Sequence, residues 1–352
     1  MLNWLCVRWP LGKEVRLRFL GLALVLLRPA GAEVVYPKNS RSLAPILDLA
    51  VQDGRVFVLH ETELAVSADA GATWVRNKVP LDPKSVFFLD ANLGWIVTAE
   101  GLFHTADAAH HWRRILKSRD LLRCWFLSAS HGYAVGNRKT ALETLDGGKN
   151  WRPLEAATGV LSDAERTSFT GIEFSGRTGF ISGYHSPKRP PQAPNSATPD
   201  ASVRQWPQLG ILIQTVDGGE TWKPSSSAIF GRMAQARVSG RSAALLLQFD
   251  YEFQWPSEVY RIDLPTGETM REYRDAGRRV CAVLPIGGTV AVAAIRLSED
   301  RQSFPRPLEL QVDQTPVPID ERLTASKCYL ARDGEKLWLA TDQGFVETVA
   351  LP

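Results

Sequence analysis

Residues 144–151 read Thr-Leu-Asp-Gly-Gly-Lys-Asn-Trp, and the same pattern, [Ser/Thr]-x-Asp-x-Gly-x-x-Trp, recurs at residues 67–74, 105–112 and 215–222. Successive aspartates of these four octets are 38, 39 and 71 residues apart. A period near 40 residues is typical of a four-stranded propeller blade. The repeat therefore predicts an all-β chain built as one β-propeller.

The residue types of the octet explain why it recurs. Its aspartate can accept hydrogen bonds from turn amides, its glycine supplies the positive φ that closes a hairpin, and its tryptophan begins the next strand as a packing wedge between blades. We therefore interpret the octet as structural. Its residues in the four copies are Asp69, Gly71, Trp74, Asp107, Trp112, Asp146, Gly148, Trp151, Asp217, Gly219 and Trp222. The second copy has Ala109 in place of glycine, so we expect its turn to be distorted or of another type.

The octet resembles the Asp-box, or BNR repeat, of sialidases, sortilin-type receptors and the photosystem II stability and assembly factors. A second repeated phrase, at residues 86–97, 124–135 and 171–182, joins an apolar strand through a polar tip to Gly-aromatic and another strand. This phrase is most similar to the assembly-factor family. The resemblance extends over about residues 45–225, and it implies a non-catalytic propeller that attends photosystem biogenesis outside the cytoplasm.

Counting strands along the remaining chain predicts seven four-stranded blades, with six and eight as the alternative counts. The last blade is one strand short at the end of the chain, and residues 33–37 belong to no other blade, so we expect them to close the ring. The expected blades are 43–79, 80–117, 118–156, 165–228, 230–274, 277–320 and 324–351.

The first 32 residues have the features of an export signal. Basic residues precede the apolar run Phe19 to Leu27, and small residues at Ala30 and Ala32 suit cleavage before Glu33. The run is shorter than the roughly 20 residues of a spanning helix, and no cysteine follows it for lipid attachment. We therefore expect an extracytoplasmic protein, periplasmic or secreted, with 33–352 as the folded part.

Composition excludes several functional classes. Hydrophobic residues make up 44% of the chain and charged residues 22%, which is an ordinary globular composition. The chain carries a net charge of +3, but residues 33–352 hold 36 basic and 37 acidic residues. The basic excess lies in the predicted signal, so the folded part gives no reason to expect nucleic-acid binding.

Three cysteines remain after the predicted cleavage, namely Cys124, Cys281 and Cys328. All three lie in apolar, strand-like runs, which favours three buried free thiols. A disulfide between Cys281 and Cys328 is the alternative.

Candidate binding residues lie in three consecutive blades, in enlarged loops between the second and third strands. Such loops on a rigid scaffold concentrate binding residues, and aromatic residues mixed with arginine are common interface anchors. The blade 4 loop has the alternative interpretation of a proline-rich excursion without function. The candidates are Tyr184, His185, Lys188, Arg189 and Trp206 in blade 4, Tyr251, Glu252 and Trp255 in blade 5, and Arg296, Arg301 and Arg306 in blade 6.

The sequence favours binding of a protein or peptide partner, with a subunit of a membrane complex among the candidates. The six histidines match no zinc pattern, and no nucleotide motif or nucleophile elbow is present in the sequence, so we expect no metal, cofactor or catalytic residue. The alternatives are a glycoside hydrolase, sialidase-like or of another Asp-box kind, and a carbohydrate-binding propeller. Sialidases use a tyrosine nucleophile, for which Tyr251 with Glu252 and arginines 189, 296 and 301 would be candidates. Adjacent residues in a strand, however, point to opposite faces.

Deleting residues 187–205 should leave the melting temperature within a few degrees of the intact chain, because a loop excursion contributes little to the core. Thermal unfolding followed by circular dichroism measures this. A cooperative loss of structure in the deletion variant would show that these residues belong to a blade.

Overall fold

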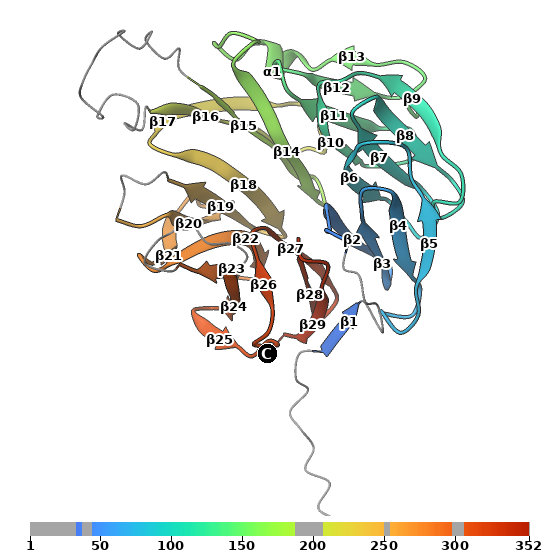
Figure 1. Ribbon diagram of the computed structural model, residues 1–352. Helices are drawn as coiled ribbons and strands as arrows, with labels where there is room; N and C mark the ends of the chain where they lie inside the picture. Colours follow the sequence, from blue (N-terminus) through green and yellow to red (C-terminus); the bar gives the residue numbers. More distant parts are fainter. Residues whose placement is uncertain (1–32, 37–43, 187–206, 250–253, 298–305, 352) are drawn as a thin grey trace, which may run out of the picture. The chain divides into compact units, whose positions relative to one another are not determined.

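Seven antiparallel sheets follow one another along the chain in the computed structural model, which describes residues 33–36, 44–186, 207–249, 254–297 and 306–351. Residues 31–352 form one compact unit. Figure 1 shows the sheets arranged around a common centre, each with its first strand innermost. The predicted seven-blade β-propeller is confirmed.

Each of the first four blades uses four strands in sequence order, from the centre to the rim. Blade 1 contains β2 (Asp48–Gln52), β3 (Arg55–Leu59), β4 (Glu63–Ser67) and β5 (Val75–Lys78). Blade 2 contains β6 (Pro83–Phe88), β7 (Gly94–Thr98), β8 (Gly101–Thr105) and β9 (Arg113–Lys117). Blade 3 contains β10 (Leu121–Phe126), β11 (Gly132–Gly136), β12 (Ala141–Thr144) and β13 (Arg152–Pro153), followed by the short helix α1 (Glu155–Thr158). Blade 4 contains β14 (Thr167–Ser175), β15 (Thr178–His185), β16 (Gln208–Thr215) and β17 (Lys223–Ile229).

Two of the last three blades depart from four consecutive strands: blade 6 has an additional strand, and blade 7 takes one strand from the N-terminal part. Blade 5 contains β18 (Arg232–Ser239), β19 (Ser242–Gln248), β20 (Ser257–Asp263) and β21 (Thr269–Arg274). Blade 6 contains β22 (Arg278–Ile286), β23 (Thr289–Arg296), β24 (Arg306–Val312) and β25 (Thr315–Val317), and β26 (Thr324–Ala325) pairs with the far end of β24. Blade 7 contains β27 (Cys328–Asp333), β28 (Lys336–Thr341), β29 (Val346–Ala350) and β1 (Glu33–Tyr36). Residues 324–325, predicted to begin blade 7, thus pair with blade 6.

The Asp-box octets form the turns between the third and fourth strands of blades 1 to 4, as predicted. In the first copy, Asp69 Oδ1 accepts hydrogen bonds from Ser67 Oγ and the Thr73 amide, both at 2.8 Å. Asp69 Oδ2 accepts a third from Thr73 Oγ1 at 2.7 Å. These bonds, first that from the Thr73 side chain, lower the pKa of Asp69 to about 2.

The second octet keeps this geometry, so the expectation of a distorted turn is wrong. The Ala109 amide donates to Thr105 Oγ1 at 3.1 Å, and the His111 amide donates to Asp107 Oδ1 at 2.9 Å. Ala109 adopts a φ of 73°, a conformation that favours glycine. The hydrogen bonds of the Asp107 carboxylate therefore hold alanine in a conformation that it adopts at some cost.

Each Asp-box tryptophan packs between its own blade and the preceding one. Trp151, which precedes β13 of blade 3, contacts a buried cluster that contains Trp95 and Leu102 of blade 2 and Phe126 of blade 3. Its ring meets Phe126 edge to face, with centroids 6.3 Å apart. Trp74, Trp112 and Trp222 occupy the same position at the other Asp-box junctions. The octet therefore joins neighbouring sheets as well as closing a hairpin.

The N-terminal strand closes the ring, as predicted. β1 pairs with β29 antiparallel and becomes the outermost strand of blade 7, so this sheet contains both ends of the folded part. Figure 1 shows β1 beside β29. The two ends of the folded part are thereby held in one sheet by backbone hydrogen bonds.

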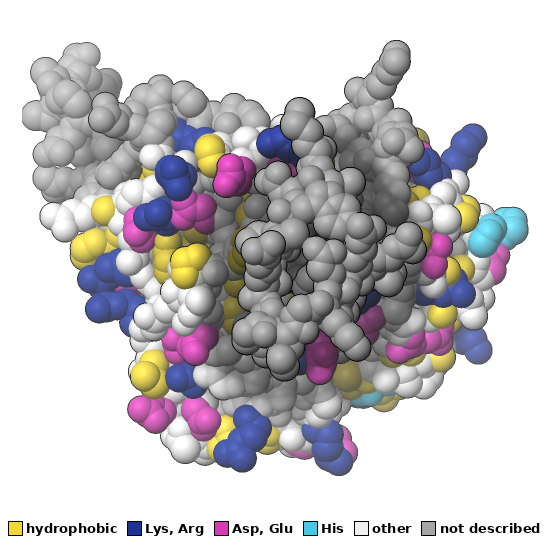
Figure 2. Space-filling model, turned by 90° about the horizontal axis from the view of Figure 1, so that it is seen from below, with side chains coloured by type: hydrophobic (Ala, Val, Ile, Leu, Met, Phe, Trp, Pro, Cys, Tyr) yellow, Lys and Arg dark blue, Asp and Glu magenta, His cyan; other side chains and the backbone are white. Residues whose placement is uncertain are grey.

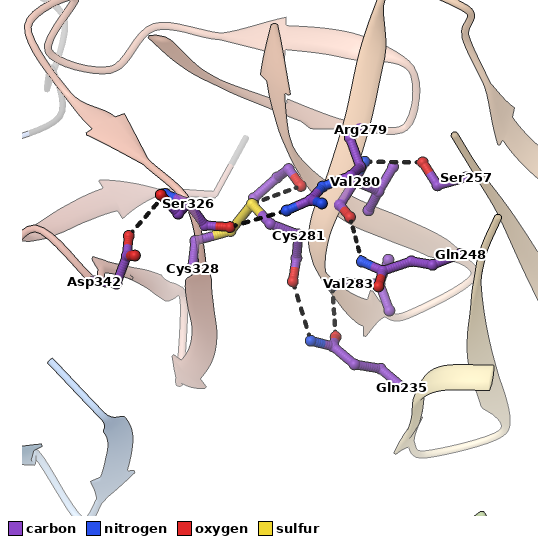
Figure 3. The surroundings of a disulfide bond; sticks show 11 residues. Gln235, Gln248, Ser257, Arg279, Val280, Cys281, Val283, Ser326, Cys328 and Asp342 are labelled. Carbon is purple, nitrogen blue, oxygen red and sulfur yellow. Dashed lines mark hydrogen bonds between the residues drawn. A yellow bond between two sulfur atoms is a disulfide. The ribbon is translucent and has the colours of Figure 1, made fainter. Parts of the chain in front are cut away.

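A disulfide joins Cys281 of β22 to Cys328 of β27, so the preferred interpretation of three free thiols is wrong. The residues are 47 apart in sequence, but the ring places the inner strands of blades 6 and 7 side by side, with the two Cα atoms 5.5 Å apart (Figure 3). Nearby, Gln235 Nε2 of blade 5 donates to the Cys281 carbonyl at 3.2 Å. Cys124 remains a buried free thiol.

Replacing Trp151 with alanine should lower the free energy of unfolding by about 3–5 kcal/mol, as truncation of a core aromatic side chain does. Leu145→Ala is the matched control, because Leu145 lies in the same turn and is 54% exposed. Its effect should stay within about 0.5 kcal/mol. Chemical denaturation measures both, and a loss below about 1 kcal/mol for Trp151→Ala would contradict its role as an interblade wedge.

Glu347 in β29 should make stability depend on pH. Its side chain is fully buried, and burial raises its pKa from 4.5 to about 7. An acid with a raised folded-state pKa stabilises the fold at low pH, and this contribution is lost between about pH 4.5 and pH 7. Glu347→Gln should therefore match the unchanged protein at pH 4 and exceed its unfolding free energy by about 2–3 kcal/mol at pH 8. Denaturation at both pH values tests this, and an equal difference at both would contradict it.

Candidate functional site

The predicted binding loops connect the second and third strands of blades 4, 5 and 6. These connections and those between successive blades lie at one end of the sheets, which we call the loop face. The Asp-box turns lie at the other end, the turn face. Of the predicted residues, Lys188, Arg189, Trp206, Tyr251, Glu252 and Arg301 lie outside the described part of the chain.

The described candidates lie at strand ends on the loop face. Tyr184 and His185 end β15, and both are half-buried. The His185 ring lies 3.1 Å from Thr167 Oγ1 through Nδ1 and 3.8 Å from Asp163 through Nε2. Arg306 begins β24 and is only 3% exposed, so it is a buried strand residue and not part of an exposed loop.

Trp255 lies over the guanidinium group of Arg274, with 3.9 Å between Arg274 Cζ and the ring centroid. Arg274 Nε donates to Glu258 Oε1 at 2.6 Å, and Arg274 Nη2 also pairs with that oxygen. Glu258 is 5% exposed and accepts another hydrogen bond from Tyr260 at 2.8 Å. A buried carboxylate therefore holds the arginine on which the indole ring rests.

Arg296, the described candidate of blade 6, joins a second ion cluster. Its Nε and Nη2 donate to Glu309 Oε1 at 2.9 and 2.5 Å. Arg278 Nε donates to Glu309 Oε2 at 2.5 Å, and Arg278 Nη1 donates to Asp275 at 3.1 Å. Burial acts to raise the pKa of Glu309, but the hydrogen bonds from the two arginines outweigh it and hold the pKa below its ordinary value.

Together these side chains form what we call the blade 5–6 rim, defined as Trp255, Glu258, Arg274, Asp275, Arg278, Arg296 and Glu309. Its three arginines and three acids balance in charge. The rim offers an aromatic surface and guanidinium groups held by ion pairs, the combination that anchors protein interfaces. Side chains held in this way lose little conformational freedom when a partner binds.

Sequence reasoning named Trp255 and Arg296 of this rim, but it did not name Arg274, Arg278 and Glu309. The missed residues lie in strands or between blades, whereas the prediction searched only the enlarged loops. The pairing of Glu258 with Arg274 follows from the register of β20 with β21, which a single sequence does not reveal. The available signal was the run of charges at residues 271–279, which extends from the second half of β21 into the start of β22.

The inner strands surround a central channel of about 890 Å³. Two ion pairs join different blades at the channel. Arg123 Nη1 of blade 3 lies 2.5 Å from Asp48 of blade 1, which is not a neighbouring blade. Arg237 Nε of blade 5 lies 2.8 Å from Glu173 of the neighbouring blade 4. Arg237 also donates to the Leu330 carbonyl of blade 7 at 3.3 Å. These two channel carboxylates are each held by an arginine.

The described residues were compared with what a metal centre or a sialidase-like site requires. They contain no group of three or more side chains placed to hold a metal ion. Of the residues considered for a sialidase-like site, only Arg296 is described, and it is bound to Glu309. The described part also contains no helix with the length and hydrophobicity needed to cross a membrane. On the side of the molecule in Figure 2, basic and acidic side chains are interspersed.

Comparison with known proteins shows that part of this chain is similar to photosystem II assembly factors. Residues 117–187, in blades 3 and 4, match the family model described as photosynthesis system II assembly factor YCF48. The chain is a BNR-type β-propeller that resembles the photosystem II assembly factors. The resemblance predicted from the Asp-box octets is thus confirmed.

The similar curated proteins match only part of the chain. The photosystem II assembly lipoprotein Ycf48 of Trichormus variabilis is 28% identical over 147 residues, which cover 36% of this chain and 42% of the relative. The chloroplastic photosystem II stability/assembly factor HCF136 of rice, Oryza sativa subsp. japonica, is 28% identical over 141 residues, which cover 38% of this chain and 28% of the relative. The match thus spans less than half of either relative.

The structural similarity extends over nearly the whole chain. A solved structure described as YCF48 bound to D1 peptide aligns with a TM-score of 0.58 and 15% identity. The alignment covers 93% of this chain and 98% of that one. At this identity the likeness shows the fold.

Arg274→Ala should lower the free energy of unfolding by roughly 3 kcal/mol, because it leaves the buried Glu258 carboxylate without its ion partner. Trp255→Ala removes only the cation–π contact and should cost about 1 kcal/mol or less. Urea denaturation of both variants measures the difference. A larger loss of unfolding free energy for Trp255→Ala than for Arg274→Ala would contradict the view that the buried ion pair contributes more than the cation–π contact.

Proposed function

We propose that this chain is an exported, non-catalytic β-propeller that binds a protein or peptide partner and assists assembly of a membrane complex, as the photosystem II assembly factors do. The observation that carries the proposal is the match of residues 117–187 to the YCF48 family model. The similar fold of YCF48 bound to a D1 peptide supports a peptide segment of a membrane protein as the class of partner.

The loop face of blades 4 to 6 supplies the binding surface in this proposal. Trp255 and Arg296 lie there, with arginines held by Glu258 and Glu309. The sequence candidates Tyr184 and His185 end the corresponding strand of blade 4. The proposal also includes, from the sequence alone, the candidates that lie outside the described residues: Lys188, Arg189, Trp206, Tyr251, Glu252 and Arg301.

Residues 1–32 act as a cleaved export signal in this proposal, and the folded part works outside the cytoplasm. The disulfide Cys281–Cys328 supports this location, because disulfides persist in oxidising compartments. The relative from Trichormus is named a lipoprotein and the relative from rice is chloroplastic, and both names fit work outside the cytoplasm.

Crosslinking capture from the host's own envelope tests the function. The exported full chain, crosslinked in cells, should recover a specific membrane-protein subunit, with crosslinked peptides on the loop face of blades 4 to 6. Trp255→Ala combined with Arg296→Ala should reduce this recovery at least about tenfold, since loss of anchor side chains weakens interfaces.

The matched control lies on the turn face. Lys149→Ala combined with Glu220→Ala changes two exposed residues of Asp-box turns and should leave the recovery unchanged. Equal recovery by the rim variant and the turn variant would show that the binding surface is not the loop face of blades 4 to 6. Failure of the unchanged protein to recover any membrane protein would contradict the proposed function.

A further inference from the structure

Blade 6 lacks the tryptophan that fills the junctions of the Asp-box blades. Its turn between the third and fourth strands has only two residues, Asp313 and Gln314, with φ of 50° and 60°. Its fourth strand, β25, has three residues, and the chain leaves the sheet before β26 pairs at the other end of β24. The outer part of the junction between blades 5 and 6 is therefore built without a wedge.

A cleft of about 470 Å³ occupies this junction, and we call it the blade 5–6 cleft. Val292 and Ala294 of β23, which are 2% and 4% exposed, line one wall. Tyr273 of β21 packs against the same apolar cluster from the neighbouring blade. Gln311 and further residues of blade 6 complete the lining. The volume is within the range of pockets that bind small ligands or single side chains.

The polar side chains that line this cleft include a paired couple and a buried hydroxyl without a partner. Arg296 and Glu309 line the cleft and are bound to each other. The Tyr273 hydroxyl is buried and has no hydrogen-bond partner among the described residues. Burial, followed by the Asp275 charge, raises the pKa of Tyr273 to about 12, so the phenol stays protonated and can donate. An unsatisfied buried donor is unfavourable, and a ligand acceptor would restore its hydrogen bond.

The side chains that line the cleft determine which kind of ligand it can bind. Apolar walls favour an aliphatic or aromatic group, and the exposed carboxylate of Glu321 in the lining disfavours an acidic one. The buried Tyr273 hydroxyl calls for one acceptor close to the apolar group. A peptide residue with a hydrophobic side chain has this arrangement, since its own backbone carbonyl is the acceptor.

We propose that the blade 5–6 cleft receives an uncharged hydrophobic side chain of the peptide partner, while the Tyr273 hydroxyl donates to a carbonyl of that peptide. The inference rests on the proposed function, and it adds the residue class that anchors the partner. Tyr273 and Arg274 are neighbours at the end of β21, so their side chains point to opposite faces of the blade 5 sheet. The cleft lies on the face toward blade 6, where Tyr273 packs with Val292 and Ala294.

Binding of capped amino acids to the mature full chain tests the cleft directly. The probes are N-acetyl-leucinamide, N-acetyl-phenylalaninamide, N-acetyl-glycinamide and N-acetyl-glutamic acid amide, titrated with detection by ligand-observed NMR. The leucine or phenylalanine probe should bind at least about tenfold more tightly than the glycine and glutamic acid probes, because burial of a hydrophobic side chain contributes on the order of one tenfold step or more.

Two variants and a matched control identify the site. Tyr273→Phe removes the unpaired hydroxyl and should weaken the hydrophobic probe about fivefold, the effect of one neutral hydrogen bond. Gln311→Trp places a large ring in the cleft and should abolish binding. Tyr260→Phe is the control, because it removes a hydroxyl of the same blade that is bonded to Glu258 and does not line the cleft. It should bind as the unchanged protein does.

Equal effects of Tyr273→Phe and Tyr260→Phe, or tighter binding of the glutamic acid probe, would overturn the inference. Unchanged melting temperatures would show that the variants are folded. The capture experiment separates the two proposals. If Tyr273→Phe and Gln311→Trp recover the membrane-protein partner normally while the rim variant does not, this inference fails and the proposed function stands. If probes bind as expected but no partner is recovered, the proposed function fails while the cleft remains a hydrophobic side-chain site.

Discussion

Closure of the ring is the constraint on which the rest of the structure depends. Blade 7 obtains its fourth strand from the other end of the folded part, through the pairing of β1 with β29. The Cys281–Cys328 disulfide adds a covalent link between the inner strands of blades 6 and 7, beside that closing sheet. An open ring would leave two blade faces and their apolar clusters in water. The relative positions of blades 4 to 6, and so of the proposed binding surface, follow from closure.

The sequence predicted the architecture well because the Asp-box combines local and long-range information. The hydrogen bonds of Asp69 with Thr73 form a turn within the eight residues of the octet. Trp151, at the end of another copy, packs against the preceding blade. The closing strand was predictable because blade 7 was one strand short. The disulfide was not, since Cys281 and Cys328 lie in apolar strands 47 residues apart and only the ring brings them together. The intact turn at Ala109 was also missed, because its hydrogen bonds outweigh the missing glycine.

The candidate site was less predictable. The prediction of Trp255 and Arg296 was based on loop length. The ring of Trp255, however, lies over Arg274, and Arg274 is brought to Glu258 by the register of β20 with β21. The blade 5–6 cleft lies at a junction whose blade 6 has no Asp-box tryptophan, and its lining includes residues of β24 and β25 whose pairing a single sequence does not reveal. Arg306 shows the opposite error, because a charged residue beside a loop proved to be buried. Side-chain burial at strand ends depends on packing that a pattern of residue types does not encode.

Amide hydrogen exchange of blade 7 tests the central claim most directly. In the mature chain, the amides of β28 and β29 should exchange as slowly as those of the central strands of blades 2 and 3. Removing residues 33–36 should increase exchange throughout blade 7 and at its junctions with blades 1 and 6, because β29 becomes an unpaired edge. Unchanged protection in the shortened chain would contradict the account, since the ring would then be closed without its N-terminal strand.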